Sequence, residues 1–254
     1  MILAGFDCTW KAAGAHDRND WLSIRWTTGT ALNQVNREKV RRRLPRRERE
    51  KLIVAEAVRF FAEVGLEGQT RALAQRLGVT QPLLYRYFPD KEALIERVYE
   101  EAFLNDWNPA WENVLAADSR PLTERVVEFY GHYVGMAFNY ERVRLAMFVG
   151  LRDCGMARRY AAFTNDHLLM PLARAIRAET GMAGEPGPAE LALAGGLHGA
   201  VVFIGVRRWV YGIETPEDLA AEVRAIIEAF VAGAPAAVAR INGLPKAPPL
   251  AATG

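Results

Sequence analysis

The chain has 254 residues, of which 50 % are hydrophobic and 24 % are charged, a composition typical of a soluble globular protein with a sizeable core. Its two cysteines, Cys8 and Cys154, fit neither a zinc-ligand spacing nor a disulfide framework, and we expect free thiols in a reducing cytoplasm. The N-terminus lacks the apolar core of a secretory signal, and the longest uncharged run, residues 191–206, is shorter than the about 20 residues that cross a membrane.

Residues 1–36 differ from the rest of the chain. They contain Trp10, Trp21 and Trp26 but show no sustained helical or strand period. Two interpretations stay open. The segment is either a poorly ordered extension, from a misassigned start or a vector, or an arm whose tryptophans dock on the body.

A short basic block follows the extension. Residues 37–51 hold nine Lys or Arg against three Glu, whereas residues 100–254 have a net charge of −4. Such a block is either the solvated start of a helix or a basic arm that contacts DNA phosphates. The arm predicts an affinity for DNA that falls steeply with salt.

From residue 45 onward the chain reads as consecutive helices, with no strand pattern and no internal repeat. The predicted helices cover residues 46–64, 70–77, 80–88, 91–107, 110–117, 121–139, 141–152, 156–180, 189–212 and 216–232. Residues 235–254 are rich in Ala and Pro and are predicted to be a disordered tail. The predicted fold class is therefore all-α.

Terminator and capping residues define the first four helices. Gly65 is expected to end the first helix, and Thr70 is expected to cap the second. Thr80 is expected to cap the third helix, where Pro82 is tolerated in the first turn. Asp90 is expected to cap the fourth.

Two prolines have positional meaning later in the chain. Pro171 is expected to kink the helix over residues 156–180. Pro216, after a capping Thr215, is expected to start the last helix.

The third helix has two different faces. Val79, Leu84 and Phe88 are expected to pack against the first two helices. The residues left for the outer faces are Gln81, Pro82, Leu83, Tyr85, Arg86 and Tyr87. Three helices with a tight turn before the third form a helix-turn-helix, and its third helix fits the major groove of DNA.

A specific residue pattern runs through residues 46–96. It consists of Ile53, Ala57, Phe61 and Gly65, the strings TRALA (70–74) and LGVT (77–80), Leu84, Tyr85, Phe88, and the string KEAL (91–94). This pattern resembles the tetracycline-repressor family of bacterial transcription regulators and covers about a fifth of the chain. Gln69 departs from it, because many members have a second threonine before Thr70, and one phosphate contact is affected.

The resemblance implies a role for each matching residue. The implied DNA-binding residues are Thr70, Arg71, Thr80, Gln81, Pro82, Leu83, Tyr85, Arg86, Tyr87 and Lys91. Gln81, Pro82 and Leu83 are expected at base edges, where glutamine suits adenine through a bidentate pair. The other side chains are expected mainly at phosphates, with Arg86 able to do either. Leu83 and Tyr87 have core packing as an alternative role.

The resemblance also implies the domain organisation. We expect an extension over residues 1–36, a helix-turn-helix domain over 37–98, a ligand-binding and dimerisation domain over 99–234, and the tail. The helices over 189–212 and 216–232 are so apolar that they need cover. A two-fold four-helix bundle between subunits supplies it, the alternative being the subunit's own helices.

Ligand-binding candidates are mostly aromatic. They are Phe129, His132, Tyr133, Met136, Phe148, Arg152, His167, Met170 and Trp209. Each has plain core packing as an alternative role. Together they favour an apolar or aromatic effector, and Arg152 suits an anionic group.

No catalytic pattern is present: serines are rare, the four histidines are scattered, and no phosphate-binding loop or metal motif occurs. We therefore expect a cytoplasmic, cofactor-free, non-enzymatic protein with no membrane partner. The predicted function is a homodimeric repressor that binds a palindromic operator in double-stranded DNA and is released by a small-molecule effector. The alternatives are an activator and a DNA-binding protein without a ligand switch.

Overall fold

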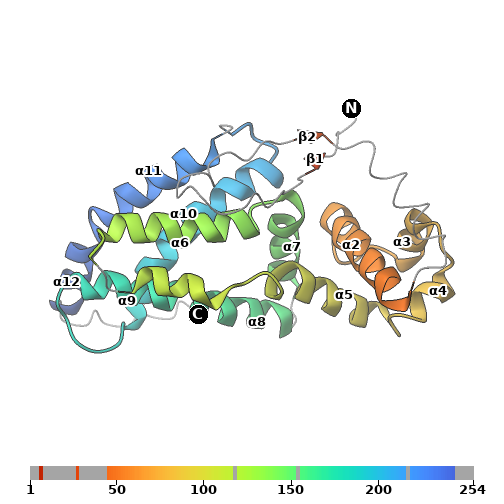
Figure 1. Cartoon of the computed structure of the whole chain (residues 1–254), viewed down its shortest axis with the longest axis horizontal. Helices are drawn as coiled ribbons and strands as arrows, with labels where there is room; N and C mark the ends of the chain where they lie inside the picture. Colours follow the sequence, from red (N-terminus) through yellow and green to blue (C-terminus); the bar gives the residue numbers. More distant parts are fainter. Residues whose placement is uncertain are drawn as a thin grey trace, which may run out of the picture. The chain divides into compact units, whose positions relative to one another are not determined.

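The computed structural model describes residues 45–116, 119–152, 155–215 and 218–243, together with the backbone of residues 6–7 and 27–28. The described residues are almost entirely helical, as predicted (Figure 1). The regular elements that are not helical are β1 (Phe6–Asp7) and β2 (Thr27–Thr28), which pair antiparallel with Phe6 opposite Thr28. The other described residues outside the helices form turns and loops. The remainder of the expected extension, the basic block up to residue 44 and the tail beyond residue 243 lie outside the described residues.

The helical elements follow the predicted order. They are α2 (Arg46–Val64), α3 (Thr70–Leu77), α4 (Gln81–Tyr85), α5 (Lys91–Tyr99), the π turn η2 (Glu100–Leu104), the 3-10 helix η3 (Pro109–Leu115), α6 (Leu122–Ala137), α7 (Tyr140–Leu151), α8 (Gly155–Thr164), the π turn η4 (Asn165–Leu169), α9 (Met170–Ala178), α10 (Pro188–Trp209), α11 (Leu219–Val231) and α12 (Ala234–Gly243).

The chain divides into two compact units. Unit 1 contains Met1–Asn108, Gly131–Ala162 and Val202–Ala220, and unit 2 contains Pro109–Tyr130, Phe163–Val201 and Ala221–Gly254. The expected boundary between residues 98 and 99 is a different division and stays a prediction.

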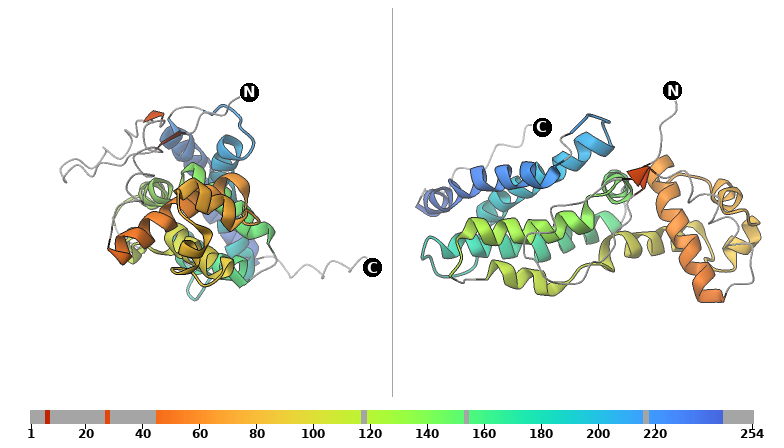
Figure 2. Two further views of the ribbon diagram at one scale, coloured as in Figure 1. Left: turned by 90° about the vertical axis from the view of Figure 1, so that its right-hand side faces the viewer. Right: turned by 45° about the horizontal axis from the view of Figure 1, so that its top comes forward.

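The helix-turn-helix of unit 1 has an apolar core shared by α2, α3 and α4. Ile53, Phe61 and Leu73 are fully buried, and Leu84 is 1 % exposed. The elements α2, α3 and α4 group together in Figures 1 and 2. The core therefore joins the first two helices to the inner side of the third, as the apolar spacing predicts.

Two glycines give the helix-turn-helix its corners. Gly65 ends α2 with a φ of 86°, and Gly78 ends α3 in the left-handed region with a φ of 69°. Side chains strain such conformations, so both positions favour glycine. The predicted role of Gly65 as a helix terminator is confirmed.

Of the three caps expected in the first four helices, one forms. The Asp90 carboxylate accepts a hydrogen bond from the backbone N–H of Ala93 at 2.7 Å. Thr70 is not a cap, because Gln69 takes that position and Thr70 lies inside α3. Thr80 precedes α4 as expected, but its side chain makes no capping hydrogen bond.

The long helix expected over residues 156–180 is interrupted by a π turn. In η4, just before Pro171, backbone hydrogen bonds join residues five apart in place of the usual four. Proline has no N–H to bond the carbonyl four residues earlier, so the helix changes register there. A second π turn, η2, interrupts the helix expected over 91–107 after Tyr99, without a proline to mark it.

The C-terminal predictions need two corrections. The last predicted helix, α11, begins at Leu219, later than predicted, and its expected first residue, Pro216, lies outside the described residues. Residues 234–243 form α12, where a disordered tail was expected, and α12 packs against α9. Alanine favours helix, Pro235 falls in the first turn, and Val238 is 1 % exposed, so burial completes the helix.

Candidate nucleic-acid interface

The recognition helix α4 is anchored from one side. Leu84 is 1 % exposed and Phe88 is 5 % exposed, and Val79 packs on the same core. The regular helix ends at Tyr85, but the backbone N–H of Phe88 still donates to the Leu84 carbonyl at 3.1 Å. The predicted inner face of this helix is confirmed.

The opposite side of α4 reaches solvent. Pro82 and Arg86 are exposed, Tyr85 is 39 % exposed, and Gln81 and Leu83 are partly exposed. A short helix seated on an apolar core and projecting polar and aromatic groups is the shape that enters a DNA groove.

A polar cluster of three side chains joins the start of α3 to α4. The hydroxyl of Thr70 lies 2.9 Å from the phenolic oxygen of Tyr85, and Nε2 of Gln81 donates to Thr70 Oγ1 at 3.0 Å. Nε2 of Gln81 also lies 3.4 Å from the Tyr85 hydroxyl. Thr70 is only 6 % exposed, so this hydroxyl acts mainly within the protein.

The other predicted DNA-binding residues lie around this cluster. Arg71 and Thr80 are exposed. Lys91 forms a 3.8 Å ion pair with Glu67, whose side chain is 86 % exposed. Exposed ion pairs are weak, so a phosphate can replace Glu67 as the partner of Lys91.

Tyr87 is partly buried. Its ring packs on the helix-turn-helix core, as the alternative role predicts, and the Arg46 guanidinium lies 5.8 Å from the ring centroid. Arg46 and Arg47, in the described part of the basic block, are exposed.

Sequence reasoning missed the ionic brace between α2 and α3. Arg76 forms ion pairs with Glu56 and Glu63, and its second contact with Glu63 is 2.8 Å long. Hydrogen bonding to Glu63 raises the pKa of Arg76 above its usual range, so the guanidinium stays charged. Because Glu56 is 6 % exposed, this pair is a buried brace and not a surface contact.

A second missed residue, Arg144, joins three helices of unit 1. Its guanidinium donates to the carbonyl of Ala62 at 2.6 Å and to the carbonyl of Trp209 at 3.2 Å. It also lies over the rings of Tyr140 and Phe148. Arg144 thereby satisfies a free carbonyl at the end of α2. The spacing of four residues between Tyr140, Arg144 and Phe148 was the only sequence signal.

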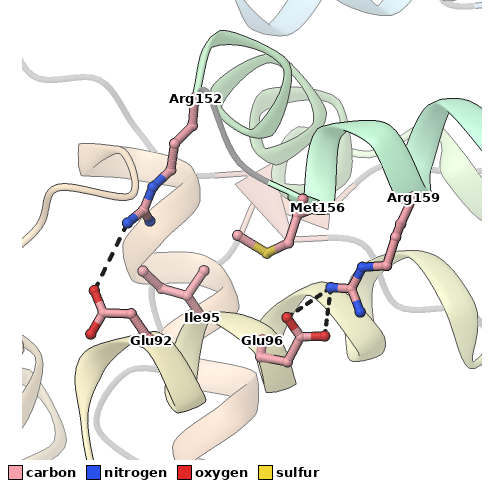
Figure 3. A pocket seen from close by; sticks show the side chains of 7 residues that line it. Glu92, Ile95, Glu96, Arg152, Met156 and Arg159 are labelled. Atoms are coloured by element: carbon pink, nitrogen blue, oxygen red, sulfur yellow. Dashed lines mark hydrogen bonds and ion pairs between the residues drawn. The ribbon is translucent and has the colours of Figure 1, made fainter.

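The side chains of α5 form one wall of a pocket of about 400 Å³ (Figure 3). Glu92, Ile95 and Glu96 come from α5, and Arg152, Gly155, Met156 and Arg159 line the other side. The Arg159 guanidinium contacts both carboxylate oxygens of Glu96, at 2.6 and 2.7 Å, and Arg152 lies 3.9 Å from Glu92. The ligand candidate Arg152 is thus paired with the first turn of α5.

The remaining ligand candidates of unit 1 lie in three different places. Tyr133 and Trp209 are brought together through edge contacts with Phe138, at centroid distances of 6.0 and 6.1 Å. Phe148 instead packs against Gly65 at the end of α2. His132 and Met136 are partly buried on α6.

In unit 2, Phe129 is 1 % exposed and packs edge-on against Tyr130. His167 Nδ1 lies 2.7 Å from the Glu112 carboxylate, and its ring stacks near Phe163. Met170 is partly buried. The assignment of a ligand site to these nine residues stays a prediction. Among the described residues, no group of three or more His, Cys, Asp or Glu side chains suits a metal ion.

The helix-turn-helix region is similar in sequence to known proteins. The family described as bacterial regulatory proteins of the tetR family matches residues 53–98. The tetracycline repressor protein class C of Escherichia coli is 45 % identical over 49 residues, which cover 19 % of this chain and 22 % of that repressor. The class A repressor from transposon 1721 of Escherichia coli is 29 % identical over 85 residues, which cover 30 % of this chain and 39 % of that protein.

Solved structures resemble a larger part of the chain. A TetR-like transcriptional regulator from Rhodococcus sp. RHA1 has a TM-score of 0.55 at 20 % identity, covering 75 % of this chain and 100 % of that one. A tetR-family transcriptional regulator from Streptomyces coelicolor has a TM-score of 0.52 at 17 % identity, covering 81 % and 94 %. At these identities the likeness concerns the fold.

Proposed function

We propose that the chain is a transcriptional regulator of the tetR family that binds double-stranded DNA through α4. The observation that carries the proposal is the division of α4 into a buried side, Leu84, and an exposed side, Pro82 and Arg86. Gln81, Pro82 and Leu83 begin this helix, where groove-binding helices contact base edges. Tyr85 ends this helix, Lys91 and Arg71 lie in the neighbouring helices, and all three suit phosphates.

We further propose that the regulator acts as a homodimer on a palindromic operator. Gly196, Gly199, Ala200 and Phe203 form an exposed stripe along α10, and Phe203 is 50 % exposed. A Cβ added at Gly196 or Gly199 meets no described atom within 4 Å. Small residues allow close approach of a second helix, so this stripe fits a second copy of the chain.

The apolar surface of the C-terminal helices is incompletely covered within one chain. Residues 188–209 and 219–243 are long and apolar enough to cross a membrane, but only 39 % and 22 % of their most apolar windows are buried. A two-fold bundle covers such surfaces in dimeric proteins. Two recognition helices then address half-sites about 34–36 Å apart or a multiple of that.

We propose that a small-molecule effector releases the DNA by moving α5. This helix follows α4 directly, and its carboxylates Glu92 and Glu96 pair with Arg152 and Arg159. A displacement of the segment 152–159 therefore pulls on the helix that carries the recognition element. An effector has this effect only if it binds the displaced state more tightly.

Selection of binding sites from a randomised double-stranded DNA library tests the proposal. The wild type is expected to select palindromic sequences, and Gln81→Ala, Tyr85→Ala and Arg71→Ala are each expected to weaken binding to them. Arg158→Ala is the matched control, because Arg158 is exposed on α8, outside the helix-turn-helix. Wild-type affinity in all three variants would end the assignment.

The dimer and the effector need separate measurements. Sedimentation at micromolar concentration is expected to show a dimer, and a monomer refutes the two-fold model. A thermal-shift screen of metabolites, followed by release of the selected DNA, identifies the effector. Failure of every stabilising metabolite to release DNA favours a regulator without a ligand switch.

A further inference from the structure

The cluster of Thr70, Gln81 and Tyr85 contains a hydroxyl that is almost inaccessible. Thr70 is 6 % exposed, whereas Tyr85 is 39 % exposed and Gln81 is partly exposed. A buried hydroxyl must find partners inside the protein, since an unpaired polar group is costly. The Thr70 hydroxyl has two, and both belong to the surface that faces DNA in the proposed function.

We propose that Thr70 is a positioning residue that decides which atoms of Gln81 and Tyr85 reach the DNA. The inference rests on the proposed function and adds a specificity determinant to it. Its basis is the geometry of the cluster, in which the Gln81 nitrogen must donate to Thr70 and the two hydroxyls of Thr70 and Tyr85 share one bond.

The first bond fixes the carboxamide of Gln81. Its nitrogen can only donate, so Thr70 Oγ1 accepts at 3.0 Å, and the same nitrogen lies 3.4 Å from the Tyr85 oxygen. Both N–H groups of the Gln81 amide therefore have acceptors within the protein. The carbonyl oxygen Oε1 is the group that remains for a base edge.

The second bond fixes the phenol of Tyr85. Either hydroxyl of this 2.9 Å pair can donate. We assign the donor to Thr70, because its buried hydroxyl already accepts from Gln81, whereas the exposed Tyr85 hydroxyl can donate outward. With Thr70 donating, the hydrogen of Tyr85 is left to point outward from a side chain that is 39 % exposed. A phosphate oxygen is the natural acceptor, and bonds to charged acceptors are the stronger ones.

This direction of bonding predicts a particular base preference. An outward carbonyl oxygen accepts from the amino group of adenine or of cytosine in the major groove. A bidentate pair with adenine also needs the amide nitrogen, which Thr70 holds back. Gln81 is therefore expected to accept both bases at one position of each half-site, and not adenine alone.

The variants Thr70→Val and Thr70→Ser separate hydrogen bonding from packing. Valine keeps the branched shape without the hydroxyl, and serine keeps the hydroxyl without the methyl group. Each protein, with the wild type, is used to select from the same randomised double-stranded library. The readouts are the base frequency at each position, the affinity for the wild-type consensus and the melting temperature.

In the wild type we expect both adenine and cytosine at the Gln81 position. Thr70→Val is expected to narrow this position to adenine, because the freed amide nitrogen can then complete the bidentate pair. The preference for the adenine-bearing site over the cytosine-bearing site is expected to rise by about tenfold, the size of about one added hydrogen bond. Thr70→Ser is expected to retain the wild-type profile. An unchanged profile in Thr70→Val, or a serine variant that behaves like valine, overturns the inference.

Two further outcomes are assigned in advance. If the wild type selects no sequence at all, the proposed function fails and not only the role of Thr70. If Thr70→Val does not fold, Tyr85→Phe decides, because it removes the hydroxyl that accepts from Thr70 and donates to phosphate. A uniform loss of affinity across sequences supports the inference, and wild-type affinity in Tyr85→Phe overturns it.

Discussion

Replacing Leu84 by alanine tests whether α4 is held from behind. The side chain of Leu84 is 1 % exposed in the core shared with α2 and α3, so the variant leaves an enclosed space. Loss of three carbon atoms from this core costs about 2 kcal/mol of transfer free energy. The cavity adds to this, and large-to-small changes at enclosed leucines cost about 2–5 kcal/mol in total.

Leu151→Ala is the matched control. The same substitution is made at the end of α7, where the leucine side chain is 86 % exposed. Exposed positions of this kind usually change stability by less than about 0.5 kcal/mol. Urea unfolding of both variants gives the free energies of unfolding, and binding to the selected DNA is measured well below the melting temperature.

The two measurements have defined outcomes. Leu84→Ala is expected to lose several-fold more stability than Leu151→Ala and to bind DNA more weakly while folded, because α4 loses its seat. Equal unfolding midpoints for the two variants contradict the clamped recognition helix. A destabilised variant with wild-type affinity for DNA shows that the seat of α4 does not control its reading face.

Three further predictions concern other parts of the molecule. Gly199→Glu places a charge on the exposed stripe of α10, where an added Cβ meets no described atom, and is expected to give folded monomers by sedimentation; a persistent dimer contradicts the stripe as the interface. Burial lowers the pKa of His198 to about 4, below its ordinary 6.5. The unfolded protein therefore binds a proton at His198 more readily than the folded protein does. The free energy of unfolding is expected to be highest above pH 6.5 and to fall by about 3 kcal/mol as the pH drops to 4. Urea titrations at several pH values are expected to show that His198→Gln removes this loss. Glu96→Gln weakens the pair with Arg159, whose side chains are 41 % and 52 % exposed, so the cost in unfolding free energy is expected to stay below about 1 kcal/mol.

The helix-turn-helix was predictable because its determinants are local. Gly65 and Gly78 end helices through their own backbone angles, and the Asp90 cap reaches only three residues ahead. The apolar spacing placed Leu84 and Phe88 on the inner side without knowledge of their partners. Such features depend only on residues close together in the sequence, so they can be predicted from the sequence alone.

The incorrect or missed predictions depend on contacts between residues that are far apart in the sequence or on burial in the folded chain. Thr70 was expected to cap α3 because threonine often does so, but its hydroxyl instead bonds Tyr85, fifteen residues away. The bond from Arg144 to the carbonyl of Ala62 spans 82 residues and leaves only an ambiguous trace in the sequence. Composition misjudged α12, because the alanines that resemble a tail also favour helix once Val238 is buried.

Local and distant contacts also differ in what they say about Gln81. The sequence gives its residue type, whereas a contact with another helix decides which of its atoms stay available. Glutamine at position 81 offers both a donor and an acceptor, and its type alone therefore suggests a bidentate pair with adenine. The bond from Gln81 to Thr70 joins α4 to α3 and uses the donor within the protein. Under the role proposed for Thr70, the bases that Gln81 accepts depend on a residue of α3, and the residues of α4 alone do not predict the specificity at this position.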